Sequence, residues 1–424
     1  MASVMTGPDS AMAARVMDHI RDPQGGSAAA LFRDLPTAAA VVRLPLDMYV
    51  LTTADLVRRA AAAPQVVIRD VEFPPETVCE VPEFAEFFAS SLSFRDRPDH
   101  HRLRRVMSAH FTPRGVAALR PALEAVVAAL VAQVAAQPGE VDLVPALSNE
   151  IPARAMGLVL GFAEDEWPWV SASGRAMLAR IATSFPHLEV TDRPVTSAQF
   201  RGIRARVEQL LDDDVPGYTL SATLARAVAA GELSRTEATD LMILLFMTGI
   251  DTVAASLTNL VLSLVGDPAA RSAWLGGEVS TRDLIEESLR ITAPLPFGMR
   301  VTTAELDLGD GVLIPAGATV ILCNASVNLD PARFPDPLSW RPGVRPLSQT
   351  FGHGTHRCLG ALLAMLECEL ALEALRPLGV RVLDPSRITW RSDISFHTPT
   401  RLPVVVGAGW GPATTGTDGA EEVR

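Results

Sequence analysis

The chain has 424 residues, of which 48% are hydrophobic and 20% are charged, a balance that excludes wholesale disorder, collagen-like repeats and a coiled-coil rod. Its 37 basic residues, all of them arginine, stand against 49 acidic ones, and the net charge of −12 argues against a general nucleic-acid coat. Four scattered cysteines are too few for a disulfide framework, so a reduced, cytoplasmic setting is expected.

In chain order, the N-terminal segment predicts no signal sequence and no membrane anchor, because charged residues interrupt its apolar runs. Short strands are predicted by alternating or β-branched runs near 39–52, 300–321 and 378–405. Helices are predicted by alanine- and leucine-rich segments over 115–136, 152–162, 220–231, 234–265, 281–292 and 359–376. We expect one mostly α domain with small β-sheets over residues 1–406. The tail 407–424 carries few large side chains and is expected to be disordered.

One predicted helix is unusually long. Ser234 followed by Glu237 is typical of a capping box, and no proline intervenes before Pro268. About 30 residues at about 1.5 Å each could cross a whole domain. The middle of the helix is apolar on every face, yet the segment Thr248 to Thr252 places a glycine, an acid and a hydroxyl there. Such locally unfavourable choices indicate a functional site.

A glycine-rich loop precedes the last long helix and contains Cys358. Because backbone N–H groups at a helix N-terminus favour negative charge, we expect Cys358 to be a stabilised thiolate. Three uses are open: a nucleophile with His356 as base, a zinc ligand with His353 and His356, or the axial ligand of a haem iron, which needs no second protein ligand.

The segment from Phe351 through Cys358 and Gly360 to Ala364 resembles the haem-binding signature of the cytochrome P450 family, FGxGxHxCxGxxLA, at every fixed position. The resemblance extends over roughly residues 95–405. It implies the cytochrome P450 fold, with a long central helix crossing over haem b (iron protoporphyrin IX). Cys358 would then be the iron ligand, with Phe351 and Gly360 in the haem-binding loop.

Other family marks follow in the expected order. Glu287 and Arg290 resemble the ExxR pair, which on residue types alone would be an ordinary helix surface pair. The family completes that network with a second arginine, and both Arg341 and Arg345 remain candidates. Four further residues resemble the family's donors to the haem propionates: His100, Arg104, Arg300 and His356.

Gly249, Asp251 and Thr252 resemble the oxygen-binding segment of the family's central helix. By this resemblance, Gly249 allows close approach, Thr252 holds dioxygen or a water, and Asp251 relays protons inward. The segment departs from the commonest form at Thr248. Residues that resemble the substrate pocket are mostly large and apolar: Leu244, Met247, Thr248, Leu295, Pro296 and Phe396.

The resemblance implies a haem-thiolate monooxygenase that uses dioxygen to hydroxylate or epoxidise an apolar small molecule, such as a bacterial terpenoid, polyketide or macrolide. The alternatives are a non-oxidative haem-thiolate ligand-binding protein or isomerase, and a peroxide-driven oxygenase. Because no GxGxxG motif is present, electrons would come from a separate ferredoxin or flavodoxin with its reductase. Arginines near the site are expected to form its docking face: Arg102, Arg105, Arg114 and Arg357.

Overall fold

The computed structural model describes residues 3–21, 28–68, 81–182, 193–213, 218–343, 348–392 and 397–412. Its α-helices are α1 (Ala11–Arg21), α2 (Ala28–Ala38), α3 (Ala54–Ala62), α5 (Pro82–Ser90), α6 (Asp99–Ser108), α7 (Pro113–Ala135), α8 (Glu150–Leu160), α9 (Trp167–Ala182), α10 (Ser197–Gln209), α11 (Leu220–Ala229), α12 (Arg235–Gly266), α13 (Pro268–Leu275), α14 (Thr281–Ile291), α15 (Asn324–Asn328) and α16 (Ala361–Leu375). Shorter helical turns are η1 (Leu92–Phe94), η2 (Ala109–Phe111), η3 (Val144–Ser148), η4 (Glu164–Glu166), η5 (Gly354–His356) and η6 (Pro385–Arg387).

The strands form four small sheets. A six-stranded sheet has the order β1 (Ser3–Thr6), β2 (Ala39–Leu44), β3 (Met48–Leu51), β9 (Thr319–Cys323), β6 (Phe297–Thr302), β4 (Val66–Val67). A four-stranded sheet has the order β14 (Gly411–Pro412), β10 (Val380–Val382), β13 (Pro403–Val406), β5 (Val141–Asp142). Two hairpins pair β7 (Leu306–Asp307) with β8 (Leu313–Ile314), and β11 (Thr389–Ser392) with β12 (His397–Arg401). The helices predicted from the sequence, and the strands near 39–52, 300–321 and 378–405, are confirmed.

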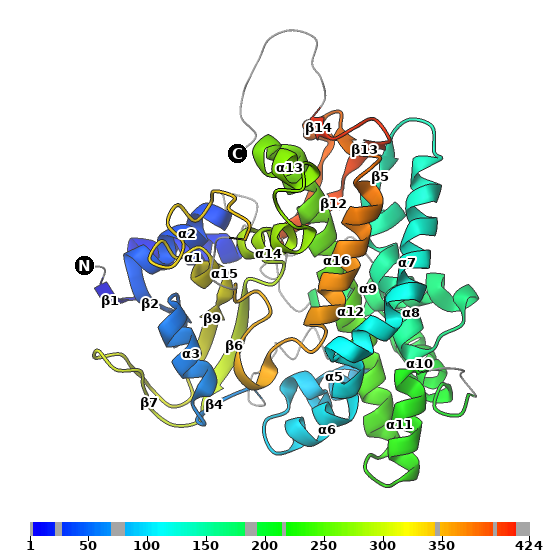
Figure 1. Ribbon diagram of the computed structural model, residues 1–424. Helices are drawn as coiled ribbons and strands as arrows, with labels where there is room; N and C mark the ends of the chain where they lie inside the picture. The colour runs from blue at the N-terminus through cyan, green and yellow to red at the C-terminus, as the bar shows by residue number, and fades with distance from the viewer. Residues whose placement is uncertain are drawn as a thin grey trace.

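The six-stranded sheet and the helical part lie side by side (Figure 1). Side chains that alternate along β2 pack on opposite faces of the sheet: Val42 joins a cluster with α1 and α2, whereas Val41 joins a cluster with α3. This separation follows from the two-residue period of a strand. The largest core surrounds α12 and draws on α7, α8, α9 and α16.

Helix α12 has 32 residues and begins with the predicted capping box. The Ser234 hydroxyl accepts the Glu237 N–H at 3.1 Å, and the Glu237 carboxylate accepts the Ser234 N–H at 2.8 Å. Its buried residues occur on all faces, as expected for a helix that crosses the interior.

By length and composition alone, helices α7 and α12 could each cross a membrane. Both also contribute buried side chains to the main core. Packing within the fold therefore accounts for their apolar character, and a globular protein's core helix passes the same test.

The prediction of disorder from residue 407 onward is wrong for residues 407–412. Strand β14 pairs with β10, and the Trp410 ring packs edge-on against Trp274 with 5.5 Å between centroids. The Trp410 indole N–H also donates to the Arg376 carbonyl at 3.2 Å. One large aromatic side chain thus anchors residues 407–412 on the helical part of the fold. Residues 413–424 lie outside the described residues.

Candidate active site

The loop that carries Cys358 is folded back on itself and packed on α3. The Cys358 N–H donates to the Phe351 carbonyl at 2.9 Å. Gly352 and Gly354 have φ values of 70° and 72°, in the left-handed region that favours glycine. A Cβ at Gly354 would lie 3.2 Å from the Ala61 carbonyl oxygen of α3. The two glycines therefore shape the turn that presents Cys358 before α16.

Cys358 is solvent-accessible, yet protein groups surround its sulfur. Desolvation raises the pKa of the thiol, whereas the backbone N–H groups of Gly360 and Ala361 and the charges of Arg104 and Arg357 lower it. The net direction is upward. The thiolate expected at Cys358 from the helix N-terminus stays a prediction. A bound metal cation would supply the missing positive charge.

Two imidazoles lie beside this loop with unsatisfied nitrogens. The rings of His100, on α6, and His356 are 4.4 Å apart between centroids. The buried His100 Nδ1 and His356 Nε2 have no hydrogen-bond partner among the described residues. Desolvation, reinforced by nearby arginines, lowers the pKa of His100 to about 4 and that of His356 to about 3. Neutral imidazole N–H groups in this position are donors in need of an acceptor.

Arg104 and Arg300 complete this donor cluster. Arg104 donates to the carbonyls of Thr355 at 3.4 Å and Arg357 at 2.6 Å, so α6 is tied to the cysteine loop. Arg300, on β6, donates to the Met299 carbonyl at 2.7 Å and contributes to the lowered pKa of His356. Burial lowers the pKa of both guanidinium groups. The structure thus brings the four predicted propionate donors together near Cys358.

This donor set fits a haem. Two orphaned imidazole nitrogens and two desolvated guanidinium groups suit a pair of carboxylates, and the adjacent thiol suits an iron. A Cβ added at Gly360, the residue before α16, would meet no protein atom within 4 Å. Among the described residues, no three His, Cys, Asp or Glu side chains converge as a metal-ligand set. The zinc interpretation of Cys358 therefore finds no support there.

Part of one face of α12 is only half-buried, although most adjoining residues of the helix are buried. Thr248, Asp251 and Thr252 are half-buried within a stretch that is otherwise largely buried. The Thr252 hydroxyl donates to the Thr248 carbonyl at 3.0 Å, and the Thr248 hydroxyl donates to the Leu244 carbonyl at 2.8 Å. Each hydroxyl proton is held by the helix, which leaves an oxygen lone pair free to accept from another group.

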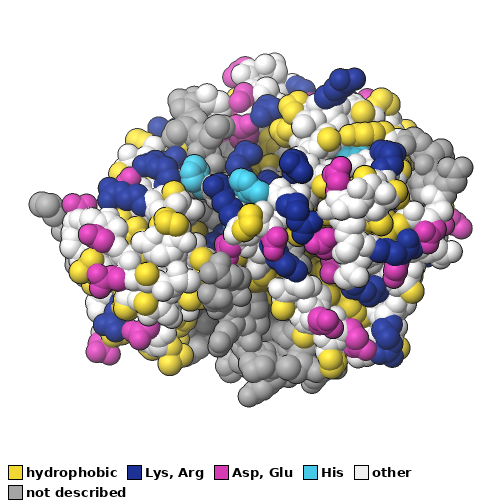
Figure 2. Space-filling view, turned by 90° about the horizontal axis from the view of Figure 1, so that it is seen from below, with side chains coloured by type: hydrophobic (Ala, Val, Ile, Leu, Met, Phe, Trp, Pro, Cys, Tyr) yellow, Lys and Arg dark blue, Asp and Glu magenta, His cyan; other side chains and the backbone are white. Residues whose placement is uncertain are grey.

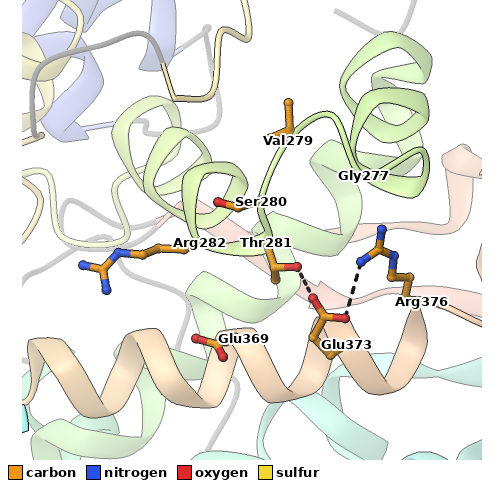
Figure 3. A pocket seen from close by; sticks show the side chains of 8 residues that line it. All are labelled: Gly277, Val279, Ser280, Thr281, Arg282, Glu369, Glu373 and Arg376. Carbon is orange, nitrogen blue, oxygen red and sulfur yellow. Dashed lines mark hydrogen bonds and ion pairs between the residues drawn. The ribbon is translucent and has the colours of Figure 1, made fainter.

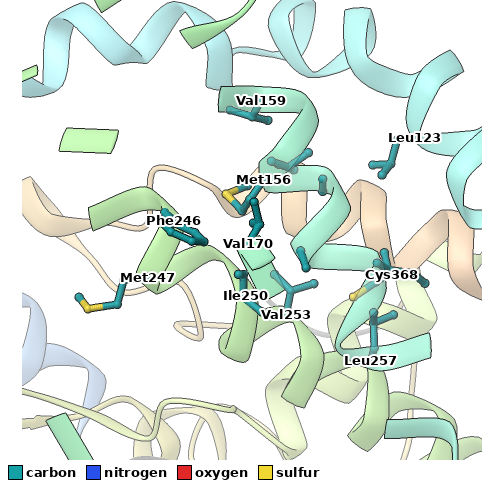
Figure 4. Close-up of a cluster of buried hydrophobic side chains, with 14 of the residues drawn as sticks. Leu123, Met156, Val159, Val170, Phe246, Met247, Ile250, Val253, Leu257 and Cys368 are labelled. Carbon is teal, nitrogen blue, oxygen red and sulfur yellow. The ribbon is translucent and has the colours of Figure 1, made fainter. Parts of the chain in front are cut away.

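Gly249 allows close approach between two helices. A Cβ at this position would lie 2.6 Å from the Met156 sulfur of α8. Figure 4 shows the buried cluster around Met156, with Phe246, Ile250 and Val253 of α12 among its side chains. The close approach observed at Gly249 is therefore between α12 and α8.

Glu287 and Arg290 form a buried ion pair, and not the ordinary surface pair that their residue types alone would suggest. Their side chains are 3% and 1% exposed, and two parallel hydrogen bonds of 2.8 Å join them. Arg290 also donates to the Asn328 carbonyl at 2.9 Å. Glu287 accepts the backbone N–H of Arg341 at 2.9 Å, whereas the Arg341 side chain points to Asp336. Arg341 thus contributes its amide to the network, and Arg345 lies outside the described residues.

The predicted substrate-pocket residues lie on two described segments. Leu244 and Met247 are buried in α12, with Thr248 half-buried beside them. Leu295 is 44% exposed and Pro296 is buried just before β6. Phe396 lies outside the described residues. The substrate contacts of these residues remain predictions.

The predicted docking arginines differ in their surroundings. Arg102 is paired with Glu237 and also donates to the Glu232 carbonyl, and its part in the docking face stays a prediction. Arg105, Arg114 and Arg357 are exposed, and the structure gives none of them an ion pair within its described part. Figure 2 shows arginine and histidine side chains gathered near the middle of the face on which α6 lies.

A separate open pocket of about 400 Å³ lies between the start of α14 and α16 (Figure 3). Its polar groups satisfy one another: Glu373 accepts from the Thr281 hydroxyl and pairs with Arg376 at 3.6 Å. Glu369 pairs with Arg120 at 2.6 Å. The pocket contains none of the predicted site residues.

Comparisons with known proteins agree with the site geometry. The family model described as "Cytochrome P450" matches residues 280–375. Cyclomarin C epoxidase CymV from Salinispora arenicola is 34% identical over 300 residues, which cover 68% of this chain and 73% of that protein. The 6-deoxyerythronolide B hydroxylase of Saccharopolyspora erythraea is 30% identical over 355 residues, which cover 79% of this chain and 82% of that protein. The crystal structure of CalO2 superimposes with a TM-score of 0.80 at 23% identity, covering 96% of this chain and 100% of that one.

Proposed function

This chain belongs to the cytochrome P450 family and is a monooxygenase, and we propose that it hydroxylates or epoxidises an apolar secondary metabolite with haem b as its cofactor. The observation that carries the proposal is the donor cluster beside Cys358. Two buried imidazole nitrogens without partners and two desolvated guanidinium groups stand next to the thiol.

In this proposal Cys358 would ligate the iron, and the donors His100, Arg104, Arg300 and His356 would bind the propionates. Gly352 and Gly354 keep the cysteine loop in its turn, and the Phe351 carbonyl fixes the Cys358 amide. When bound, the haem supplies dioxygen activation and the transfer of one oxygen atom to the substrate.

The central helix supplies and holds protons. The Thr252 hydroxyl donates to the Thr248 carbonyl, so its oxygen keeps a lone pair that can accept from a water. Asp251, half-buried on the adjoining face, is the group that exchanges protons between the interior and solvent. Both residues are needed for reduction of dioxygen coupled to substrate oxidation, and we therefore favour this reading over a peroxide-driven or non-oxidative one.

Electrons come from a separate ferredoxin or flavodoxin with its reductase. Three of the predicted docking residues are exposed: Arg105, Arg114 and Arg357. Arg357 directly precedes Cys358, and its carbonyl accepts from Arg104. A basic surface close to the iron ligand suits an acidic electron carrier on an otherwise acidic protein. The proposed location is the cytoplasm.

The substrate class follows from the apolar predicted pocket and from the relatives. Leu244, Met247, Leu295 and Pro296 offer apolar surface, with Thr248 as a polar exception. The matched relatives are named as an epoxidase of cyclomarin C and a hydroxylase of 6-deoxyerythronolide B. The corresponding class for this chain is an apolar secondary metabolite such as a terpenoid, polyketide or macrolide.

The test is turnover of the purified protein with a ferredoxin, its reductase and reduced nicotinamide. A candidate substrate should be consumed together with dioxygen, and one oxygen atom from ¹⁸O₂ should appear in the product. Substrate conversion that proceeds without dioxygen, or with peroxide alone at the same rate, would contradict the proposal.

A further inference from the structure

The inference concerns Asn328, the last residue of α15, which lies outside the set of residues predicted from the sequence. The residue is 0% exposed. Its backbone carbonyl accepts from Arg290, which belongs to the buried ion pair of α14. Its side-chain amide bonds to two consecutive residues, Gln349 and Thr350, just before the loop that carries Cys358. One buried residue therefore joins the ion pair to the start of the cysteine loop.

The hydrogen bonds of the Asn328 amide can form in one orientation only. The Gln349 backbone N–H donates to the Asn328 Oδ1 at 2.6 Å, and a backbone N–H cannot accept, so the oxygen lies on that side. The Nδ2 group then donates to the Thr350 hydroxyl oxygen at 2.9 Å, as the Ser348 hydroxyl does at 3.1 Å. The Thr350 hydroxyl donates its own proton to the Leu289 carbonyl of α14 at 2.6 Å. Asparagine, which carries an acceptor and a donor, satisfies both of its partners.

Two backbone hydrogen bonds connect this anchorage to Cys358. The Gly352 N–H donates to the Gln349 carbonyl at 2.8 Å, which closes a turn directly after the anchored residues. Phe351 lies within that turn, and its carbonyl accepts the Cys358 N–H at 2.9 Å. The side chain of Asn328 therefore restricts the position of the carbonyl that holds the Cys358 backbone.

We propose that Asn328 is a positioning residue, whose side-chain amide transmits the placement of the buried Glu287–Arg290 pair to the loop from which Cys358 ligates the iron. The proposal rests on the proposed haem function. The ion pair holds the end of α15 through the Asn328 carbonyl, and the side chain of the same residue holds the loop. Because the carbonyl belongs to the backbone, a side-chain replacement leaves the bond to Arg290 in place and removes only the bonds to the loop.

Three variants and one control test this connection. Asn328→Ala removes both bonds to the loop. Thr350→Val removes the hydroxyl at nearly the same side-chain volume, whereas Thr350→Ser keeps it. Ser326→Ala is the matched control, because Ser326 is also 0% exposed on α15 and its hydroxyl donates to the Thr52 carbonyl at 2.7 Å, outside the cysteine loop.

Two measurements report on the loop itself. The first is hydrogen–deuterium exchange of the Gly352 and Cys358 amides in the purified full-length protein, which does not depend on catalytic activity. The second is the rate at which the reduced carbon monoxide complex loses the red-shifted Soret band of thiolate ligation in mild urea. The free energy of global unfolding is measured in parallel, so that a local change in the loop is distinguished from a general loss of stability.

Asn328→Ala and Thr350→Val should each raise the exchange rate of the Cys358 amide at least about fivefold, the factor that corresponds to about 1 kcal/mol for one hydrogen bond. Both should lose the red-shifted band faster by a similar factor, and Thr350→Ser should behave like the wild-type protein. Ser326→Ala should reduce global stability but leave the exchange of the Cys358 amide and the band unchanged.

Unchanged exchange of the Cys358 amide in Thr350→Val, or an equal rise in Ser326→Ala, would overturn the proposal. The comparison of Thr350→Val with Thr350→Ser decides the question even if Asn328→Ala does not fold. A wild-type protein that binds no haem would instead overturn the proposed function.

Discussion

The buried pair of Glu287 and Arg290 allows a quantitative test of the network that supports the cysteine loop. Replacing Glu287 by Gln removes the charge that balances Arg290, whose side chain is 1% exposed. A buried cation left without its counter-charge costs about 3–5 kcal/mol. The two bonds of 2.8 Å and the bond to the Arg341 amide would also weaken. We expect Glu287→Gln to lower the free energy of unfolding by about 3–5 kcal/mol.

Arg341→Ala is the internal comparison. Its backbone N–H, which Glu287 accepts, is unchanged by the replacement. Its side chain is 52% exposed, and Asp336, 3.6 Å away, is 60% exposed. Exposed pairs of this kind contribute about 0–1 kcal/mol. Replacing the pair together, as Glu287→Leu with Arg290→Met, should cost less than the two single changes added, because no buried charge is then left alone.

The assay is urea unfolding followed by circular dichroism, with haem content measured on the same samples. A loss for Arg341→Ala as large as that for Glu287→Gln would show that the guanidinium of Arg341 belongs to the network. Strict additivity in the double replacement would show that Glu287 and Arg290 do not act as a pair.

Three further predictions concern α12 and the helical turn η2. Thr252→Ala should divert electrons from product to hydrogen peroxide, which peroxide measured per reduced nicotinamide consumed will show; tight coupling in this variant would remove the proposed role of the hydroxyl. His110 is buried against Tyr218 and bonded to Thr223, and desolvation, with Arg226, lowers its pKa from 6.5 to about 4. Because the unfolded chain binds the proton more readily, the free energy of unfolding should fall as pH decreases from about 6.5 toward 4. That part of the fall should be missing in His110→Gln, and identical pH profiles would contradict the assignment. Gly249→Val should cost about 1–3 kcal/mol by overpacking Met156, with partial recovery on adding Met156→Ala, whereas the exposed Gly202→Ala on α10, where a Cβ meets nothing within 4 Å, should be neutral or stabilising. An equal loss at both glycines would show that the cost at Gly249 does not come from the contact with Met156.

Local signals were sufficient for much of the fold. The capping box at Ser234 and the proline-free run to Pro268 identify α12 with its bounds nearly correct, since both are properties of a single segment. The glycines around Cys358 are equally local, because their φ values are set by the turn itself.

Properties that depend on distant partners could not be derived from the residue types alone. An i, i+3 pair of opposite charges looks the same on a surface and in a core, so only the family resemblance pointed to the network of Glu287 and Arg290, and its burial appears when α14 is packed. Arg102 is paired with Glu237, which is 135 residues away in the chain. The contact of Gly249 with Met156 likewise depends on where α8 lies.

One missed feature did leave a trace in the sequence. Trp410 is a large aromatic residue in a segment otherwise poor in them, and such a residue indicates burial.

The central claim is that the sulfur of Cys358 ligates a haem iron, and the carbon monoxide complex of the reduced protein tests it most directly. The wild-type protein should show the strongly red-shifted Soret band of thiolate ligation, and Cys358→His should bind haem but show the unshifted band of imidazole ligation. A colourless protein, or a wild-type band at the position of the histidine variant, would contradict the account.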